Sequence, residues 1–507
     1  MGSFTQDRVI SSDRMASLSI QRIIAIAGAA ALVGLIATSN QSLWIDEAQS
    51  ATKAMQPSVT AWWSAMFIDR GSDLQMPLYM FYLWAWAKVF GASEIALRAG
   101  NLPWLAAGIM ALTYAIPAKS RSTFSILIIG LSNAFLWYYI GEARPYTVLF
   151  AFSALTATCL LRLVQNPAPS TPSKSWYGWF CLGITGMCAT SLLAVPWAAG
   201  AIGAVLYWNG FPGALRITGR FFFCTIVTAC ALAGLGFYYL WSLRVGARAS
   251  DVGNTGLINI GFIFYELLGV SGLGPGRVSL REQGPMTLIP YIPQILIGMA
   301  GALALCMAGI IAVRKRATVQ ALVFFGIAIV LPSAVVLGGG AAVHMRLLGR
   351  HFMPVLPYLS LLSAAGFERM VSANRLWMRA TAMAALAVLL ISALEIRFAP
   401  RHRRDDYRTA ATEALQAITN GRKVLWAADC SAARYYHVPV NEPAVILGSA
   451  IGNDSLRSQP APDLVFLSKP DIYDSEGVIR KYLRNNDFKV IRELQAFRIF
   501  ARSTAPR

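Results

Sequence analysis

The segment Trp44-Ile45-Asp46-Glu47 brings two adjacent carboxylates to the end of the first long apolar run of the chain, Ile23 to Thr38. An ionised carboxylate costs at least about 3 kcal/mol inside the hydrocarbon of a membrane. We therefore expect the pair at the water boundary, where a carboxylate can take a proton from an incoming hydroxyl group. Asp46 is the candidate general base, and Glu47 is the adjacent alternative.

Asp46 also has a purely structural interpretation, a salt bridge with a nearby base such as Lys53. Neighbouring residues on a helix point about 100° apart, so Asp46 and Glu47 would not share one partner. A second acidic candidate is Asp73, in Asp73-Leu74-Gln75-Met76-Pro77-Leu78-Tyr79. It can assist the acceptor or hold the helix that follows. Asp405 and Asp406 are expected to cap a helix over 408–419.

Several basic residues have no obvious acidic neighbour in the sequence and lie near the ends of apolar runs. Arginine holds phosphate through bidentate, charge-assisted hydrogen bonds, so these residues are candidates for a phosphate-binding site. The alternative is that they extend to lipid headgroups and bind no substrate. The candidates for phosphate binding are Arg144, Arg346, Arg350 and His351, with His344 nearby, and those for a substrate loop are Arg277, Arg281 and Tyr79.

The composition places these residues in a membrane protein. Of 507 residues, 56% are hydrophobic and only 14% are charged, and the mean hydropathy is +0.51. Such values indicate a polytopic α-helical membrane protein. Runs long enough to cross about 30 Å of hydrocarbon predict about eleven spans, near 20–38, 97–117, 122–140, 146–165, 177–193, 195–210, 219–242, 288–313, 318–338, 351–367 and 377–396. The stretch 177–210 also fits one long helix. We interpret the first run as an anchor, not a signal peptide.

Positive charge accumulates in short cytoplasmic loops, and an N-terminus inside the cell satisfies this rule. The basic residues then on the cytoplasmic side are Lys119, Arg121, Arg162, Lys174, Arg216, Arg220, Arg314, Lys315, Arg316, Arg369, Arg375 and Arg379. Much of the formal net charge of +19 is therefore explained by the membrane topology. It forms no basic stripe with interleaved aromatic residues, so nucleic acid is not an expected partner.

This topology predicts two outer loops, 39–96 and 243–287, that wall the site. The segment Pro77 to Gly91 must then lie on the outer surface as an interfacial helix, with tyrosines and tryptophans at headgroup depth. The pair Trp62-Trp63 suggests another amphipathic piece. A membrane domain, 1–397, is followed by a periplasmic α/β domain, 398–507, with strands expected near 423–427, 463–467, 489–492 and 497–501 and helices near 408–419 and 474–485.

The sequence lacks several catalytic motifs. It contains no P-loop, no glycine-rich dinucleotide fingerprint, no Gly-x-Ser-x-Gly elbow and no His/Cys metal spacing. We therefore expect no nucleotide energy source and no required cofactor, and a divalent metal is not indicated. Six of the seven cysteines fall in expected spans, so no disulfide framework is implied. Cys430 is expected to be a buried thiol.

Three segments in order carry a resemblance to a known family. They are Trp44-Ile45-Asp46-Glu47-Ala48, then Pro77-Leu78-Tyr79 through Leu97-Arg98, and then Glu142-Ala143-Arg144-Pro145-Tyr146, with Gly349-Arg350-His351 agreeing more loosely. The chain resembles the bacterial C-type (GT-C) membrane glycosyltransferases that use polyprenyl-phosphate sugars, family 39. Its similar relatives are the protein O-mannosyltransferase-like and aminoarabinose-transferase-like enzymes. That family commonly shows two prolines where this chain has Met76-Pro77.

The resemblance implies an acidic base or acceptor anchor in the first outer loop, at Asp46, and basic residues that hold the lipid phosphate, at Arg144, Arg346 and Arg350. A hexosyl or pentosyl group would move to a lipid, glycan or protein hydroxyl at the periplasmic face of a bacterial inner membrane. Because the leaving phosphate is already anionic, arginine can stabilise it without a metal, and an inverting single displacement is the simplest chemistry.

Other functions remain open from the sequence. A polysaccharide polymerase or ligase would use a diphosphate-linked glycan, and lipid-donor profiling would separate it from a monosaccharide transferase. A lipid or glycan transporter should show repeated halves or broken helices at corresponding positions, which the sequence does not show convincingly. A non-enzymatic assembly scaffold would survive loss of Asp46.

Overall fold

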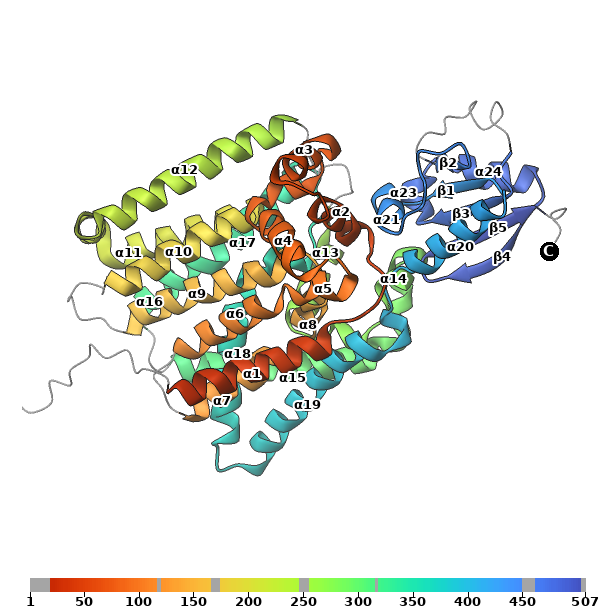
Figure 1. Ribbon diagram of the computed structural model, residues 1–507. Coiled ribbons are helices and arrows are strands. Elements are labelled where there is room, and N and C mark those ends of the chain that lie inside the picture. Colours follow the sequence, from red (N-terminus) through yellow and green to blue (C-terminus); the bar gives the residue numbers. More distant parts are fainter. Residues whose placement is uncertain are drawn as a thin grey trace, which may run out of the picture.

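The computed structural model describes residues 19–115, 120–165, 174–245, 255–314, 318–448 and 461–502. Long helices pack side by side into a bundle, and a small sheet domain lies at one end of it, beside the short helices α2 and α14 (Figure 1). The chain is therefore a multi-pass membrane domain followed by an α/β domain. Of the sequence expectations, the charges before Ser19, Lys119, Lys315, Arg316 and residues 246–254 of the second outer loop lie outside the described residues.

Within the described residues, eight helical segments are long and apolar enough to cross a membrane. They are α1 (Ile20–Ala37), α5 with α6 (Glu94–Tyr114), α9 (Tyr146–Gln165), η2 with α11 (Leu192–Arg220), α12 (Phe222–Val245), η4 with α15 (Pro285–Arg314), α16 to α17 (Val319–Ala342) and α19 (Leu376–Phe398). A ninth is the pair α7 (Ser120–Leu131) and α8 (Ala134–Ile140), bent by 64° at Ser132 and Asn133. Asn133 caps α8 by accepting from the amides of Phe135 and Leu136.

The expected number of eleven spans is not confirmed, because two of the expected runs form shorter helices. They are α10 (Lys174–Thr190), with 17 residues, and α18 (Leu356–Val371), with 16 residues. At 1.5 Å per residue such helices reach roughly 24–26 Å, less than the hydrocarbon thickness. The stretch 177–210 is two helices, because α10 ends at Thr190 and α11 (Val195–Arg220) follows a turn at Leu192–Ala194.

The helices of the membrane domain approach closely where small residues meet. At Gly366 of α18, an added Cβ would lie 1.8 Å from the carbonyl oxygen of Leu305 in α15 (Ile292–Arg314). At Gly309 it would lie 2.1 Å from the carbonyl oxygen of Leu362. Small residues let transmembrane backbones pack at this distance and gain dispersion contacts. These two glycines therefore set the spacing of α15 and α18.

The first outer loop contains the expected short helices. They are α2 (Ile45–Ala54), α3 (Val59–Asp69), the turn η1 (Ser72–Gln75) and α4 (Pro77–Phe90). With 14 residues, α4 does not meet the length of a span, consistent with the interfacial position expected for Pro77 to Gly91. Pro77 begins α4 at a position where no helical hydrogen bond is lost, and α5 (Glu94–Ala99) then leads into α6 (Leu102–Tyr114).

The second outer loop and the segment before α18 are built from short turns. The loop contains α13 (Leu257–Leu267), η3 (Ser271–Leu273), α14 (Arg277–Gln283) and η4 (Pro285–Tyr291). A π-helical turn, η5 (Gly326–Val330), joins α16 (Val319–Phe325) to α17 (Leu331–Ala342), and η6 (Gly349–Val355) precedes α18. The segment that carries Arg350 is therefore a short turn with a long helix on either side.

The C-terminal domain is the expected α/β unit. Its sheet has the strand order β2-β1-β3-β5-β4, with β1 (Val424–Ala427), β2 (Val445–Leu447), β3 (Leu464–Ser468), β4 (Phe488–Leu494) and β5 (Phe497–Arg502). β1 pairs in parallel with β2 and β3, whereas β5 is antiparallel to β3 and β4. The sequence predicted four of these strands and missed the three-residue β2. The remaining elements are η7 (Pro400–His402), α20 (Tyr407–Thr419), α21 (Cys430–Tyr435), α23 (Pro470–Tyr473) and α24 (Val478–Asn485).

Direct contacts place this domain on the same side of the bundle as α2. The amide of Leu43 donates to the Tyr436 hydroxyl at 2.8 Å, and Arg408 pairs with Glu94 at 2.7 Å. Because α2 follows the first span, an even number of spans must separate it from the C-terminal domain. Eight spans would leave seven after α2, so a total of nine or eleven fits the contacts and eight does not.

Candidate active site

Asp46 lies in the first turn of α2 and faces Arg350, which is far from it in the sequence of the membrane domain. Its Oδ2 accepts a hydrogen bond from Arg350 at 3.0 Å, and the two side chains are 24% and 20% exposed. The sequence left open a pair with Lys53, and the structure instead places Lys53 against Asp73 and Asp69. Of the two adjacent carboxylates, Asp46 is thus the accessible one.

Glu47 points the opposite way and is fully buried. Its carboxylate accepts from Arg98 Nε at 2.8 Å, from Arg98 Nη2 at 2.7 Å, from Arg404 Nη1 at 3.1 Å and from the amide of Ala143 at 2.8 Å. Burial alone would raise the pKa of Glu47, but the two arginines outweigh it and hold this pKa below its usual range. Glu47 therefore ties α2 to the segment that carries Arg144, and no free oxygen faces a substrate.

Asp73 is also buried and holds Arg144. Its Oδ1 accepts from Arg144 Nη1 at 2.8 Å, and its Oδ2 accepts from Lys53 at 2.8 Å. Burial raises the pKa of Asp73, but the charges of Lys53 and Arg144 reverse the shift and lower it. The same Arg144 nitrogen reaches Ser50 Oγ at 2.8 Å and the Asp46 carbonyl at 3.2 Å. Asp73 and Arg144 thus fix each other beside Asp46.

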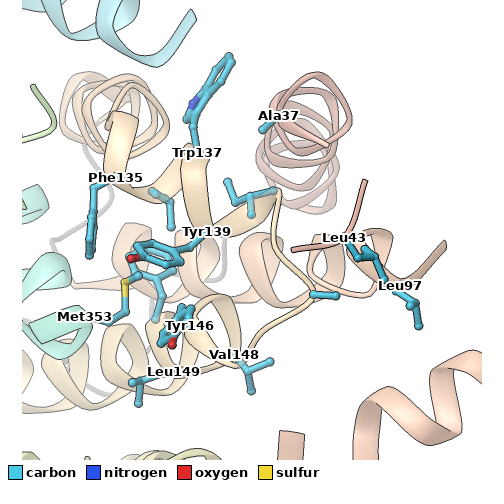
Figure 2. Close-up of a cluster of buried hydrophobic side chains, with 14 of the residues drawn as sticks. Ala37, Leu43, Leu97, Phe135, Trp137, Tyr139, Tyr146, Val148, Leu149 and Met353 are labelled. Carbon is cyan, nitrogen blue, oxygen red and sulfur yellow. The ribbon is translucent and has the colours of Figure 1, made fainter. Parts of the chain in front are cut away.

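Aromatic rings lie close to the guanidinium group of Arg350. Its guanidinium lies 5.8 Å from the ring of Tyr146, which packs edge-on against Tyr139 with ring centroids 4.6 Å apart. Figure 2 shows these two rings together, with Met353 close by. Among the residues that the structure describes, the Nε atoms of Arg144 and Arg350 are both buried and have no hydrogen-bond partner. Two neighbouring arginines, each with an unused N–H group, can donate to a phosphate.

The second outer loop reaches the same region through Arg277. Its Nη2 pairs with the buried Glu266 at 2.5 Å, and its guanidinium lies 3.7 Å from the ring of Tyr138. The other oxygen of Glu266 accepts from the amide of Gly349 at 2.9 Å. A Cβ at Gly349 would lie 2.3 Å from that oxygen, so glycine allows the approach. Glu266 therefore connects Arg277 to the residue before Arg350.

Among the described residues, the remaining candidates form no hydrogen bond or ion pair with Asp46. Arg346 is exposed and forms no ion pair with the described part of the chain. Arg281 pairs with Asp471 of the C-terminal domain at 2.7 Å. His351 accepts from the amide of Leu348 through Nδ1 at 3.2 Å, and burial lowers its pKa to about 3. Tyr79 is buried, and its hydroxyl has no partner among the described residues.

Sequence reasoning missed two arginines of this site and one acid. Arg98 and Glu142 were noted only as parts of motifs, and Arg404 was assigned no role. Arg404 Nη1 contacts both Glu47, at 3.1 Å, and Glu142, at 3.2 Å. Burial raises the pKa of Glu142, against the charge of Arg404. No local pattern signals these contacts, since they join residues 262 and 357 positions apart.

The C-terminal domain packs directly against α2 and the loop before it. Tyr436 accepts from Leu43, as described above, and its hydroxyl lies 3.1 Å from Ser42 Oγ. The Tyr435 hydroxyl donates to the Ala92 carbonyl at 2.7 Å. Lys469, which pairs with Asp405, lies 5.7 Å from the Trp44 ring. Asp406 caps α20 as expected, accepting from the Thr409 amide at 3.2 Å.

The site contains acids and arginines but no recognisable metal centre. Among the described residues, no group of three histidine, cysteine or acidic side chains could hold a metal ion. The site can bind an anion through Arg144 and Arg350 and accept a proton at Asp46. These are the two tasks of a transfer from a phosphate-linked donor to a hydroxyl group.

Comparisons with known proteins agree on the fold. No family model matches the chain, and no curated protein matches its sequence. The crystal structure of ArnT from Cupriavidus metallidurans in the apo state has a TM-score of 0.51 at 14% identity, covering 95% of this chain and 98% of that chain. ArnT from the same organism bound to undecaprenyl phosphate has the same TM-score and identity, covering 97% and 100%. The chain therefore has the fold of the GT-C membrane glycosyltransferases, as its motifs predicted.

Proposed function

We propose that this chain is a membrane glycosyltransferase that moves one sugar from a polyprenyl-phosphate donor to an acceptor hydroxyl group. The observation that carries the proposal is the convergence of Asp46, Arg144 and Arg350, which lie far apart in sequence. The contact between Asp46 and Arg350 alone joins residues 304 positions apart. A base beside two arginines suits a donor that is held by its phosphate.

In the proposed reaction Asp46 takes the proton of the acceptor hydroxyl as that oxygen attacks the anomeric carbon. The bond from the anomeric carbon to the phosphate oxygen breaks with oxocarbenium character. Arg350 and Arg144 stabilise the second negative charge that develops on the phosphate. A single displacement of this kind inverts the anomeric centre.

Glu47 and Asp73 act in this proposal as positioning residues, because all their oxygens are engaged by buried cations and amides. The fold supports the donor class, since the similar ArnT structure contains undecaprenyl phosphate. We further propose that the site and the C-terminal domain face the periplasm of a bacterial inner membrane. The basic loops described above support that orientation.

The test compares cells with the wild-type chain, Asp46→Asn and Glu47→Gln, with mass spectrometry of envelope glycolipids and glycans. We expect Asp46→Asn to reduce transfer by roughly 10²-fold or more, the range for loss of a general base, while the protein still inserts and folds. Glu282→Gln, which changes an exposed carboxylate on α14, is the matched control and should retain transfer. Near-normal transfer in Asp46→Asn would contradict the assigned role.

A further inference from the structure

The charges around Asp46 compensate one another in pairs. Asp46 pairs with Arg350, and Asp73 pairs with both Arg144 and Lys53, at 3.0, 2.8 and 2.8 Å. Lys53 also reaches Asp69 at 3.1 Å. A sugar phosphodiester that enters this group adds one negative charge, so it must compete with a carboxylate for an arginine.

The two arginines differ in how firmly they are held. Arg144 is buried, and its Nη1 donates to Asp73, Ser50 and the carbonyl of Asp46. Arg350 is partly exposed and has Asp46 as its one hydrogen-bonding partner among the described residues. Its Nε is buried and has no hydrogen-bond partner in the described ranges. Arg350 can therefore turn to a new anion by giving up a single hydrogen bond.

The same contact limits Asp46 as a base. The Oδ2 atom of Asp46 accepts from Arg350 at 3.0 Å, so it is less available to accept a hydrogen bond from an acceptor hydroxyl group. The base role assigned above needs this contact to be released before the acceptor hydroxyl loses its proton. The structure thus gives Arg350 two competing anions, the Asp46 carboxylate and the donor phosphate.

We propose that the donor phosphate takes Arg350 from Asp46, so that the base becomes active only in the donor complex. This inference rests on the proposed function and adds an order of binding, donor before acceptor. The acceptor proton moves to Asp46, the acceptor oxygen bonds to the anomeric carbon, and the electron pair of the broken bond stays on the phosphate. The phosphate thereby changes from a monoanionic diester to a dianionic monoester, held by Arg350 and Arg144.

The experiment is calorimetric titration of the purified full chain with undecaprenyl phosphate. In the wild type the phosphate must break the partly exposed ion pair between Asp46 and Arg350, whereas in Asp46→Asn this pair is absent. We therefore expect Asp46→Asn to bind roughly 2- to 5-fold more tightly. The same substitution in an Arg350→Gln background should give no gain, because no arginine remains to be released.

Two further variants complete the test. Arg350→Gln should bind about tenfold more weakly or worse, because a charged donor to the phosphate is lost. Glu282→Gln changes an exposed carboxylate on α14 and should match the wild type. Equal affinity in the wild type and Asp46→Asn, with weaker binding in Arg350→Gln, would overturn the exchange and leave the proposed donor site intact. A wild type that does not bind the lipid would instead contradict the proposed function.

Discussion

The buried carboxylate Glu47 permits a quantitative test of how the site is built. Glu47→Gln keeps the size of the side chain but removes its charge, and it turns an amide NH2 group toward the donors of Arg98 and Arg404. The buried Arg98 then loses its carboxylate partner, and Arg404 keeps only Glu142 as a carboxylate partner. Breaking a buried ion pair in this way costs about 3–5 kcal/mol, so we expect the free energy of unfolding to fall by at least about 3 kcal/mol.

Glu142→Gln is the matched control, because Glu142 shares Arg404 with Glu47 but has one buried oxygen without a partner. The raised pKa of Glu142 means that its ionisation opposes folding. Its contribution to stability is full below the unfolded pKa, near 4.3, and is lost as the pH rises through the folded value. Glu142→Gln should therefore change the free energy of unfolding by less than about 1 kcal/mol at pH 7. As the pH rises, the stability of the variant should increase relative to that of the wild type.

The contribution of Glu47 to stability depends on pH in the opposite direction. Its folded pKa is lowered, so its contribution is present above the unfolded pKa and is lost as the pH falls through the folded value. The assay is unfolding of the purified protein by dodecyl sulfate in mixed micelles, followed at several pH values for both variants and the wild type. A Glu47→Gln protein as stable as Glu142→Gln would refute the assignment of Glu47 as the buried anchor of α2.

Three further predictions use other parts of the structure. The pKa of His351 is lowered to about 3, so the contribution of the neutral side chain to stability should be lost as the pH falls from about 6.5. The difference in unfolding free energy between the wild type and His351→Gln should therefore shrink between pH 7 and pH 5. Gly366→Leu places a side chain against the Leu305 carbonyl and should lower the thermal midpoint of the purified protein, whereas Gly338→Leu, where an added Cβ meets no atom within 4 Å, should change it little. A reporter that functions only after export should be active when fused after Arg507, and a reporter that functions only in the cytoplasm should be silent there. The reverse result would place the C-terminal domain and Asp46 in the cytoplasm.

Much of the architecture could be predicted because it depends on local chemistry. Apolar runs of sufficient length predicted the membrane spans, and the strand and helix patterns after residue 397 predicted the α/β domain. Short elements were harder, since β2 has three residues and depends on its pairing with β1. The count of eleven spans is not confirmed at α10 and α18, because a hydrophobic run does not indicate how much of it becomes one helix.

The sequence by itself placed Asp46 at a membrane rim, because a charged side chain beside an apolar run has few other positions available. It also identified arginines that the topology did not require. It wrongly treated them as lacking acidic neighbours: Arg144 pairs with Asp73, Arg277 with Glu266, Arg281 with Asp471 and Arg350 with Asp46. Only the tertiary structure decided these partners and separated the partly exposed Asp46 from the buried Glu47. Ion pairs form between residues that packing brings within about 4 Å, and separation along the chain carries no information about that distance.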